Sequence, residues 1–388
     1  MRKDLIAIVV LALAAGAGHA ADRVKVGFVS TLSGPQGAPG IDARDGFQLA
    51  VKMLGGKLGD LPVEVLVADD QFNPEVGKQA VERFVKRDRV DFVTGIIYSN
   101  VLLAAAPSAF EAKVPYVSSN AGPSQLAGSG CNPWFASAAW QNDASHEASG
   151  QYATSKGFKT VYLMAPNYPA GKDALAGFKR FYKGRIVDEV YPKLGQLDFA
   201  AELAQVRAAK PDAVYAFMPG GMGINFIKQY VAAGLSKDIQ LVLPGFSADE
   251  DTIKPVGEPM LGLFNAAHWT PDLDNAESKR FVAAFEKEFG RIPTMYAAQG
   301  YDAALMMDGA LRAVKGKAED REALMRALRT GKYRSVRGDY KMNNNGFPIQ
   351  SYYLRVVGKD AQGRIVNKTI GTIFTNHADA YAKDCKLK

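Results

Sequence analysis

Short apolar runs alternate along the chain with segments whose apolar residues recur every three or four positions. The run Val24–Ser30 is typical of a buried strand, and the apolar residues from Phe47 to Leu54 then share one face of a helix. Further strands are expected at 62–67, 91–95 and 114–118, and helices from Asn73-Pro74 onward and over 100–112. Strand–helix–strand units of this length predict a parallel sheet with helices on both faces.

The same pattern starts again near residue 160. Strands are expected at 160–165, 185–191, 212–217 and 239–243, with helices between them at 171–182, 199–208 and 224–233. This repetition is typical of a second α/β unit rather than of one very large sheet.

Helical patterns without strands then follow, at 275–289, 296–314 and 321–329. Such helices must cover a sheet made elsewhere, most simply the first one. The tail is β-rich at 333–342 and 351–357, and the turn Asn343–Gly346 separates these two stretches. We therefore expect the chain to cross between the two units near 138–142, 268–271 and 343–346.

The predicted fold class is α/β, with two Rossmann-like lobes whose parallel sheets are joined by a hinge of three chain segments. Lobe 1 is expected to hold residues 21–139 and 271–346, and lobe 2 residues 140–270 and 347–388. A length of 388 residues suits two domains better than one. A hydrophobic share of 47% can fill two cores, which excludes a disordered chain.

The N-terminus has the pattern of a secretory signal peptide. Arg2 and Lys3 precede an apolar run at 5–15, and small residues at Gly18 and Ala20 suit cleavage after Ala20. A membrane anchor is the alternative, but eleven apolar residues are too few to span a bilayer, and no later run approaches the roughly 18 apolar residues that a spanning helix needs. We expect export to the periplasm of a mature chain, residues 21–388, without a transmembrane helix.

Charge and cysteine content narrow the partners. Lysine and arginine outnumber aspartate and glutamate by 47 to 40, but the charges are interspersed, so no nucleic-acid partner is expected. One pair of cysteines, Cys131 and Cys385, in an oxidising compartment favours a disulfide over two buried thiols. The cysteines and the four histidines show no metal-ligand spacing, so no metal or other cofactor is expected.

Small polar residues follow three strands of the first unit. In open parallel sheets, ligands bind beyond the carboxyl ends of the strands, where helix N-termini converge. The loops there carry Ser33-Gly34, Tyr98–Asn100 and Ser118–Asn120. Helix N-termini present unpaired N–H groups and a positive dipole end, so this edge favours a carboxylate. The alternative is that these serines are ordinary helix N-caps.

Rings gather at the same predicted edges and crossings: Tyr98, Tyr116, Trp140, Tyr168, Phe246, His268, Trp269 and Tyr296. Rings that face a cleft offer flat apolar walls, and ring pairs add about 0.5–1.5 kcal/mol beyond the burial of their area. This favours an aromatic or otherwise apolar acid, such as a benzoate-like one. The alternative is that most of these rings pack the hinge and the core.

No catalytic constellation stands out, and we do not expect an enzyme. His146, His268 and His377 have no nucleophile beside them, and His146 is expected in a solvated first helical turn. The turn Gly220–Gly223 lacks the Lys-Ser/Thr of a phosphate-binding loop. We interpret it as a close-approach turn, with Gly221 on the lobe 2 face of the cleft.

Several segments together carry a family resemblance: Val26–Gly34, Asp69-Asp70, Val114–Asn120, Gln299–Ala303 and Asn345-Gly346. With them, and in this order, the chain resembles the periplasmic substrate-binding proteins of ATP-driven (ABC) importers in the leucine/isoleucine/valine-binding family. The resemblance covers essentially the whole mature chain. It implies the type I periplasmic binding fold, in which two lobes close on a small solute that is handed to permease subunits in the inner membrane. We expect a monomer.

The family's carboxylate contacts map onto Ser99 and the turn Ser119–Ala121, and its aromatic residue in lobe 2 maps onto Tyr168. Amino-acid binders of the family place an acid after the strand expected at 239–243, but here Pro244–Ser247 follows and the acids come later. An ammonium buried without a counter-charge costs several kcal/mol, which disfavours an amino acid. The expected ligand-binding residues are Ser33, Tyr98, Ser99, Ser119, Asn120, Ala121, Trp140, Tyr168, Gly221, Phe246 and His268.

Two other functions stay open. A branched-chain or other amino acid is the alternative ligand for an importer of the same class. A sensory module that presents its ligand to a membrane receptor would have the same fold and would differ only in its partner.

Overall fold

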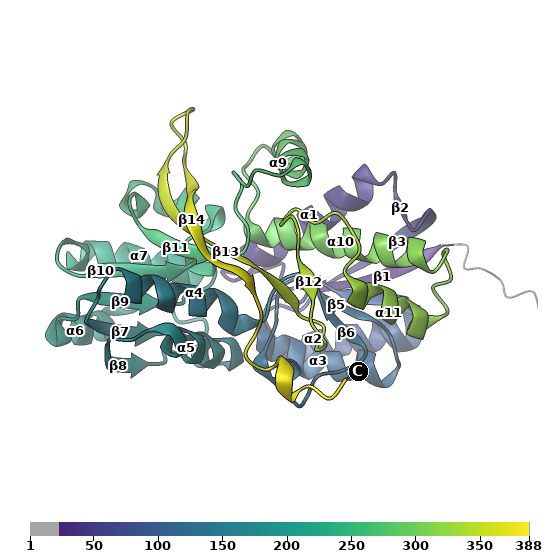
Figure 1. The fold of residues 1–388 in the computed structure, drawn as a ribbon, viewed down its shortest axis with the longest axis horizontal. Helices are drawn as coiled ribbons and strands as arrows, with labels where there is room; N and C mark the ends of the chain where they lie inside the picture. The colour runs from purple at the N-terminus through teal and green to yellow at the C-terminus, as the bar shows by residue number, and fades with distance from the viewer. Residues whose placement is uncertain (1–22, 388) are drawn as a thin grey trace, which may run out of the picture.

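The computed structural model describes residues 23–387, so the expected signal peptide lies outside the described residues. The chain forms two α/β lobes that lie side by side, each built around its own sheet (Figure 1). This confirms the fold class predicted from the alternation of strands and helices. The lobe boundaries given above stay a prediction.

The first sheet has the strand order β2-β3-β1-β4-β5-β6. Its strands are β1 (Val24–Ser30), β2 (Lys57–Leu58), β3 (Leu61–Asp69), β4 (Phe92–Thr94), β5 (Tyr116–Ser118) and β6 (Phe135–Ser137). Neighbours pair in parallel except β2, which pairs antiparallel with β3. The side chains of Val26 and Phe28 on one face of β1 and of Val29 on the other are fully buried, as expected for a strand covered on both faces.

Helices from two distant parts of the sequence cover this sheet: α1 (Ala38–Met53), α2 (Pro74–Arg83), α3 (Ser99–Glu111), α9 (Ala276–Phe289), α10 (Met295–Ala313) and α11 (Arg321–Thr330). The backbones of α1 and α10 are in contact. A Cβ atom at Gly46 would lie 1.9 Å from the carbonyl oxygen of Ala297, and one at Gly300 would lie 1.9 Å from that of Ala43. The late helices thus pack on the first lobe, as predicted (Figure 1).

The second sheet has the order β12-β13-β11-β10-β9-β7-β8, and β14 pairs with β13. Its strands are β7 (Thr160–Met164), β8 (Arg185–Val190), β9 (Ala213–Ala216), β10 (Gln240–Pro244), β11 (Phe264–Ala267), β12 (Lys341–Met342), β13 (Pro348–Lys359) and β14 (Ile365–His377). Strands β7 to β11 are parallel, and β12, β13 and β14 are antiparallel to their neighbours. Its helices are α4 (Asn142–Ser155), α5 (Pro169–Phe181), α6 (Ala200–Ala209), α7 (Gly221–Ala232) and α8 (Glu250–Val256).

Short helical turns lie between these elements: η1 (Phe84–Asp88), η2 (Ser124–Leu126), η3 (Leu235–Lys237), η4 (Gly245–Ser247), η5 (Glu258–Met260) and η6 (Ala382–Asp384). Of the stretch expected to be β-rich at 333–342, the structure forms a strand only at β12. The strands β2, β6, β11 and β14 and the helix α8 were not predicted, and of α4 only a solvated first turn at His146 was expected.

Helix α4 could not be predicted from the spacing of apolar residues. Its first nine residues are buried although most of them are polar. Asp143 and Glu147 are acceptable there because Arg180 forms an ion pair with both carboxylates. The expectation that His146 lies in a solvated turn is wrong, since its side chain is only 1% exposed.

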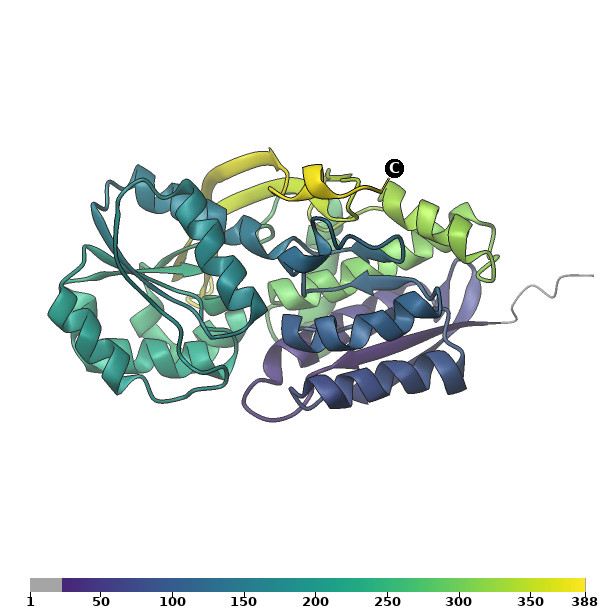
Figure 2. The same ribbon diagram turned by 90° about the horizontal axis from the view of Figure 1, so that it is seen from below.

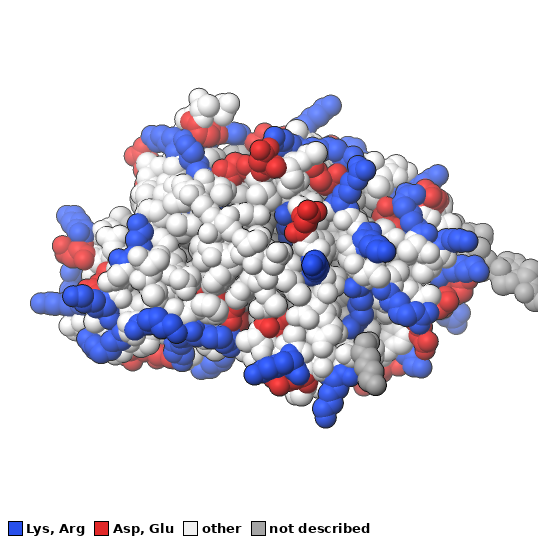
Figure 3. Space-filling model, viewed as in Figure 1, with Lys and Arg blue, Asp and Glu red and all other residues white. Residues whose placement is uncertain are grey.

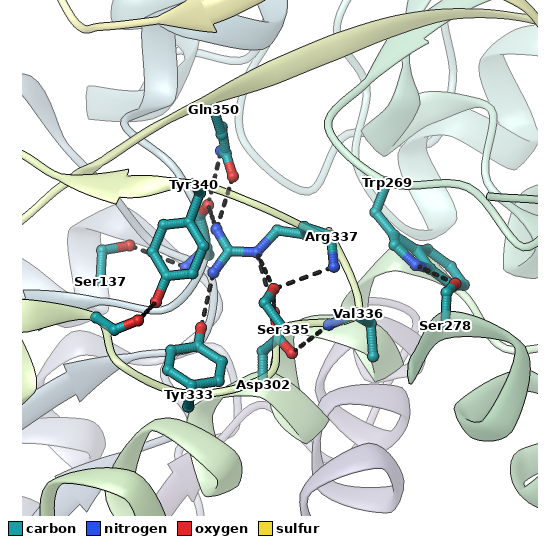
Figure 4. Close-up of polar contacts among 12 residues, drawn as sticks. Ser137, Trp269, Ser278, Asp302, Tyr333, Ser335, Val336, Arg337, Tyr340 and Gln350 are labelled. Carbon is teal, nitrogen blue, oxygen red and sulfur yellow. Dashed lines mark hydrogen bonds and ion pairs between the residues drawn. The ribbon is translucent and has the colours of Figure 1, made fainter. Parts of the chain in front are cut away.

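One buried guanidinium joins the segments that connect the lobes. Arg337 donates from Nη1 to the carbonyl oxygen of Ala139 (3.1 Å) and to Gln350 Oε1 (2.6 Å), and from Nε to Asp302 Oδ2 (2.9 Å). Its Nη2 donates to the hydroxyl of Tyr333 (2.8 Å). As Figure 4 shows, Asp302, Tyr333 and Gln350 surround the guanidinium. Ala139 lies in the first crossing between the lobes, Gln350 in β13 and Asp302 in α10. The side chain of Arg337 therefore links three segments that meet where the lobes join.

The C-terminal tail is fastened to the first lobe. Cys131 and Cys385 form the predicted disulfide, with Cα atoms 5.7 Å apart. Asn344 Nδ2 donates to the carbonyl oxygen of Ala382 (3.1 Å), and Arg180 Nη2 donates to the hydroxyl of Tyr381 (3.3 Å). Figure 2 shows the yellow C-terminal segment running along both lobes. The tail therefore restrains the two lobes as well as the chain end.

Charged side chains of both signs are interspersed on the face drawn in Figure 3, with uncharged surface between them. Within residues 23–387, no helix has the length and apolar character needed to cross a bilayer. In the same part of the chain, no group of three or more His, Cys, Asp or Glu side chains is placed to hold a metal ion.

Candidate functional site

A ring-lined cavity lies between the lobes at the carboxyl ends of both sheets. Its lining residues follow β4, β5, β6, β7, β9 and β10 or begin helices there: Ile97, Tyr98, Ser99, Asn120, Trp140, Asn142, His146, Tyr168, Ala170, Phe217, Pro219, Phe246 and Tyr296. This is where ligands bind in open α/β sheets, and here both lobes contribute. We call it the central cavity.

The lobes are closed over the central cavity. The Gly221 N–H at the start of α7 donates to the carbonyl oxygen of Pro35 in the opposite lobe (3.1 Å). Trp140 and Phe246 meet edge to face with centroids 4.3 Å apart. The remaining space is about 20 Å³, about enough for one water molecule. A ligand with an aromatic ring needs more room, so the lobes or the rings must move apart for it to enter.

Helix N-termini from both lobes face the central cavity. Helix α3 begins at Ser99 and α5 at Pro169, and neither N-cap residue, Tyr98 or Tyr168, caps the helix with its side chain. The first amides of α3 are therefore left for another acceptor, and the positive ends of two helix dipoles meet at the cavity. Such a pair of helix ends stabilises an anion without a lysine or arginine.

Ser99 is oriented to donate a hydrogen bond. Its Oγ accepts a hydrogen bond from Asn142 Nδ2 (3.1 Å), which leaves its own proton for a ligand. The same Nδ2 also donates to Asp173 Oδ2 (2.9 Å), and Asn142 Oδ1 accepts from the Gly122 N–H (3.0 Å). Asn142 thus holds the first turns of α3, α4 and α5 together. Sequence reasoning missed Asn142 because the burial of α4 was not predicted.

The central cavity carries no full charge. None of its lining residues within the described chain is Asp, Glu, Lys or Arg. Burial lowers the pKa of His146 to about 3 and raises the pKa of Tyr98 and Tyr168, so these groups are neutral at pH 7. The site offers hydrogen-bond donors to a carboxylate but no counter-charge to an ammonium group.

The acids that follow β10 point elsewhere. Asp249 accepts from the Met295 N–H through Oδ2 (2.6 Å) and pairs with Arg355 through Oδ1 (3.3 Å). Glu250 Oε1 accepts from the Asn367 N–H (2.9 Å). These bonds anchor α8 and β14 and leave neither acid in the central cavity.

A larger hollow of about 580 Å³ opens at the rim, between α1, α8 and the loop before α10. Asp42 and Asp251 line it, and burial raises their pKa to about 6 and about 7. The lining also holds Lys254, Arg291 and Arg364, so charged side chains of both signs meet in the rim hollow. It differs in this from the central cavity.

The structure brings together part of the predicted set. The predicted residues that line the central cavity are Tyr98, Ser99, Asn120, Trp140, Tyr168 and Phe246. Those that lie outside it are Ser33, Ser119, Ala121, Gly221 and His268. The role of every one of these residues in binding stays a prediction.

The residues outside the cavity have identifiable positions. Ser33 is exposed on the loop after β1. The turn after β5 is held by Ser118 Oγ, which donates to the carbonyl oxygen of Ala121 (2.6 Å). Gly221 forms the contact between the lobes, and His268 packs against Trp140 with ring centroids 4.8 Å apart. Gly221 thus lies at the edge of the central cavity, and His268 packs behind the ring of Trp140.

Seven lining residues were outside the predicted set of ligand-binding residues: Ile97, Asn142, His146, Ala170, Phe217, Pro219 and Tyr296. For two of them a signal existed in the sequence. Phe217 and Pro219 follow β9 directly, at the edge where ligands bind, and the position of the predicted strand could have pointed to them. His146 could not be found this way, because its burial depends on how α4 packs.

Comparison with known proteins agrees with this geometry. A family model described as periplasmic binding protein matches residues 23–362. A solved solute binding protein of an ABC transporter from R. palustris, in complex with benzoate, is 31% identical, with 94% of this chain and 100% of that chain covered and a TM-score of 0.89. Another, from Rhodopseudomonas palustris BisB5 in complex with 3,4-dihydroxy benzoic acid, is 32% identical, with 92% and 99% covered and a TM-score of 0.87.

A curated relative carries a different ligand in its name. The Leu/Ile/Val-binding protein homolog 6 of Brucella melitensis is 29% identical over 380 residues, which is 95% of this chain and 96% of the relative. The family match spans most of the chain, and the two-lobed fold described above agrees with it. The protein therefore belongs to the periplasmic binding protein family.

Proposed function

We propose that this protein binds an aromatic or otherwise apolar carboxylate in the central cavity and delivers it to the permease subunits of an ABC transporter. The observation that carries the proposal is the neutral, ring-lined cavity onto which helix N-termini from both lobes open. The benzoate and dihydroxybenzoate complexes of the two solved relatives support the same ligand class.

Binding begins on lobe 1 in this mechanism. The carboxylate docks at the first turn of α3, where Ser99 and the free amides donate to its oxygens. The ring then lies among Trp140, Tyr168 and Phe246, and lobe 2 closes over it. Closure excludes water, which strengthens the polar contacts inside. The ligand shifts the balance between open and closed forms only by its extra affinity for the closed form.

The proposal also covers compartment and partners. The mature protein starts after Ala20, acts in the periplasm as a monomer and carries out no catalysis. Permease subunits of the inner membrane receive the closed form. Recovery of the permease with a tagged, exported protein tests the partner, and N-terminal sequencing of the exported chain tests the cleavage site.

An amino acid is the second candidate, because the curated relative is named for leucine, isoleucine and valine binding. The α-amino acid would place an ammonium group in a cavity whose described lining holds no carboxylate. Burying that charge without a partner costs several kcal/mol, which is why the acid is preferred.

Calorimetry separates the two candidates. The protein is unfolded, dialysed and refolded to remove any bound solute, then titrated with benzoate, cyclohexanecarboxylate, leucine, valine and benzylamine. We expect saturable binding of the two carboxylates and none of benzylamine, which presents the opposite charge on the same ring. Tight leucine or valine binding with no response to either acid would overturn the proposal.

A further inference from the structure

His146 occupies an unusual position in the central cavity. It lies on α4, four residues after Asn142, so the two side chains share a face of the helix about 6 Å apart along its axis. Asn142 holds Ser99, at the carboxylate end of the cavity. The imidazole lies between Phe217 and Phe246, with centroids at 5.0 and 5.5 Å. The polar edge of the imidazole thus lies between two apolar rings.

One nitrogen of this imidazole is engaged inside the protein, since a hydrogen bond joins His146 Nδ1 to the hydroxyl of Tyr215. Nε2 is the nitrogen that is left for another partner. When Nδ1 carries the proton and donates to Tyr215, the lone pair of the neutral ring is on Nε2.

A neutral imidazole has one proton, and Nε2 is left as an acceptor. Burial keeps the ring neutral, with a pKa of about 3. Within residues 23–387, Tyr215 is the only side chain that forms a hydrogen bond with His146. Nε2 has no protein hydrogen-bond partner among the described residues, and His146 lines the central cavity, where a ligand can pair with this nitrogen.

We propose that His146 Nε2 accepts a hydrogen bond from a ring hydroxyl of the ligand, so that the protein selects aromatic acids hydroxylated opposite the carboxylate, the 4-hydroxybenzoate class. The inference rests on the proposed function. The carboxylate sits at Ser99, and the para hydroxyl reaches along α4 to His146. A neutral acceptor suits this task because it draws in the hydroxyl proton without repelling the carboxylate.

The test compares ligands of similar size that differ in their ability to donate. The refolded protein is titrated with 4-hydroxybenzoate, 4-methylbenzoate, 4-methoxybenzoate and benzoate. We expect 4-hydroxybenzoate to bind about tenfold or more tightly than each of the others, since only it pairs the lone pair on Nε2. Equal affinity for 4-hydroxybenzoate and 4-methylbenzoate overturns the inference while leaving the proposed function intact. If no carboxylate binds at all, the proposed function itself fails.

Two variants identify the residue. His146→Phe keeps a ring of similar shape and removes the acceptor, so the advantage of 4-hydroxybenzoate over 4-methylbenzoate should disappear. Tyr215→Phe removes the oxygen that holds the proton on Nδ1, so the advantage should shrink without any change in the cavity wall. An advantage that persists in folded His146→Phe protein overturns the assignment. If that variant does not fold, Tyr215→Phe decides.

The tautomer can be read without any ligand. Long-range ¹H–¹⁵N spectra of the refolded protein distinguish a proton on Nδ1 from one on Nε2. We expect the Nδ1–H form for His146 in the wild type. An Nε2–H form would make this nitrogen a donor and overturn the inference, whatever the affinities are.

Discussion

Ser99 Oγ, at the start of α3, accepts a hydrogen bond from Asn142 Nδ2. The hydroxyl proton of Ser99 is then free to be donated to a ligand. A hydroxyl that is already fixed from one side needs little further ordering when a carboxylate arrives. No capping bond from the side chain of Tyr98 or Ser99 is formed there, so the hydroxyl of Ser99 does not act as a helix cap.

Ser99→Ala should weaken the binding of benzoate or 4-hydroxybenzoate by about 1–3 kcal/mol, the range for a lost hydrogen bond to a charged group. Isothermal titration calorimetry measures the change. Ser108→Ala, in the same helix but far from its N-terminus, is the control and should bind as the wild type does. An unchanged affinity in Ser99→Ala would remove this residue from the site.

Asp70 is a buried carboxyl without an ion pair. Thr31 Oγ1 (2.5 Å) and the Phe72 N–H (2.9 Å) both donate to its Oδ1, and burial raises its pKa to about 6. A raised pKa in the folded state means that the folded chain keeps this proton longer than the unfolded chain. Stability from this group is therefore present below pH 4 and is lost as the pH rises from about 4 to about 6.

Asp70→Asn keeps the Oδ1 acceptor and cannot ionise. Its melting temperature should exceed that of the wild type by a few degrees at pH 8, and the difference should vanish near pH 4. Asp69→Asn is the control of opposite sign: partial burial opposes the effect, but the Leu32 and Gln71 N–H groups hold the pKa of Asp69 below its usual value. Calorimetric melting at pH 4, 6 and 8 measures both. A constant difference across this range for Asp70→Asn contradicts the prediction.

At the scale of elements, closure depends on how the start of α7 meets the loop after β1. The Gly221 N–H bonds to Pro35, and a Cβ at Gly221 would lie 2.7 Å from the same carbonyl oxygen. The neighbouring Gly220 has a φ of 57°, which a side chain rarely tolerates. Two adjacent glycines therefore let a helix N-terminus touch the opposite lobe.

Gly221→Val should hinder closure while leaving each lobe folded. We expect affinity for the preferred acid to fall about tenfold or more, because the ligand would then have to bind a form that closes poorly. Small-angle scattering at saturating ligand should show less contraction than in the wild type. Gly371→Ala, where a Cβ meets nothing within 4 Å, is the control. Full contraction of Gly221→Val on ligand binding would exclude this contact as a determinant of closure.

Elements with strong apolar patterns could be predicted, and those stabilised by polar pairs could not. The strand Val24–Ser30 and the N-cap at Asn73 lie where the sequence placed them, and Asn73 Oδ1 accepts from the Glu75 N–H (2.9 Å). Helix α4 was missed because its burial rests on ion pairs with Arg180, a partner far away in sequence. Missing α4 also meant missing Asn142 and His146, since both are brought to the cavity by this helix.

In the molecule as a whole, the disulfide closes a loop of 254 residues and links the C-terminal tail to the first lobe. A cross-link between such distant positions restricts the unfolded chain strongly, and its measured effect is typically about 2–4 kcal/mol. The hinge network around Arg337 adds a second restraint on the same segments.

The free energy of unfolding of the double variant Cys131→Ser/Cys385→Ser should therefore be about 2–4 kcal/mol lower than that of the oxidised wild type. Urea unfolding measures the difference, and the wild type in reductant serves as a matched control that should approach the variant. If the oxidised wild type and the variant unfold at the same urea concentration, the bridge contributes nothing to the stability of this fold.

The α/β class, the two sheets, the pairing of the cysteines and the loops that line the central cavity could be predicted from the sequence, because these depend on local periodicity and on few possible partners. The sequence also has no acid directly after β10, which disfavoured an amino acid. Which residues of these loops face the cavity, and that His146 lies among them, could be seen only in the folded chain. Those properties arise where side chains from distant segments exclude water together and share their hydrogen bonds, and no local pattern records such a meeting.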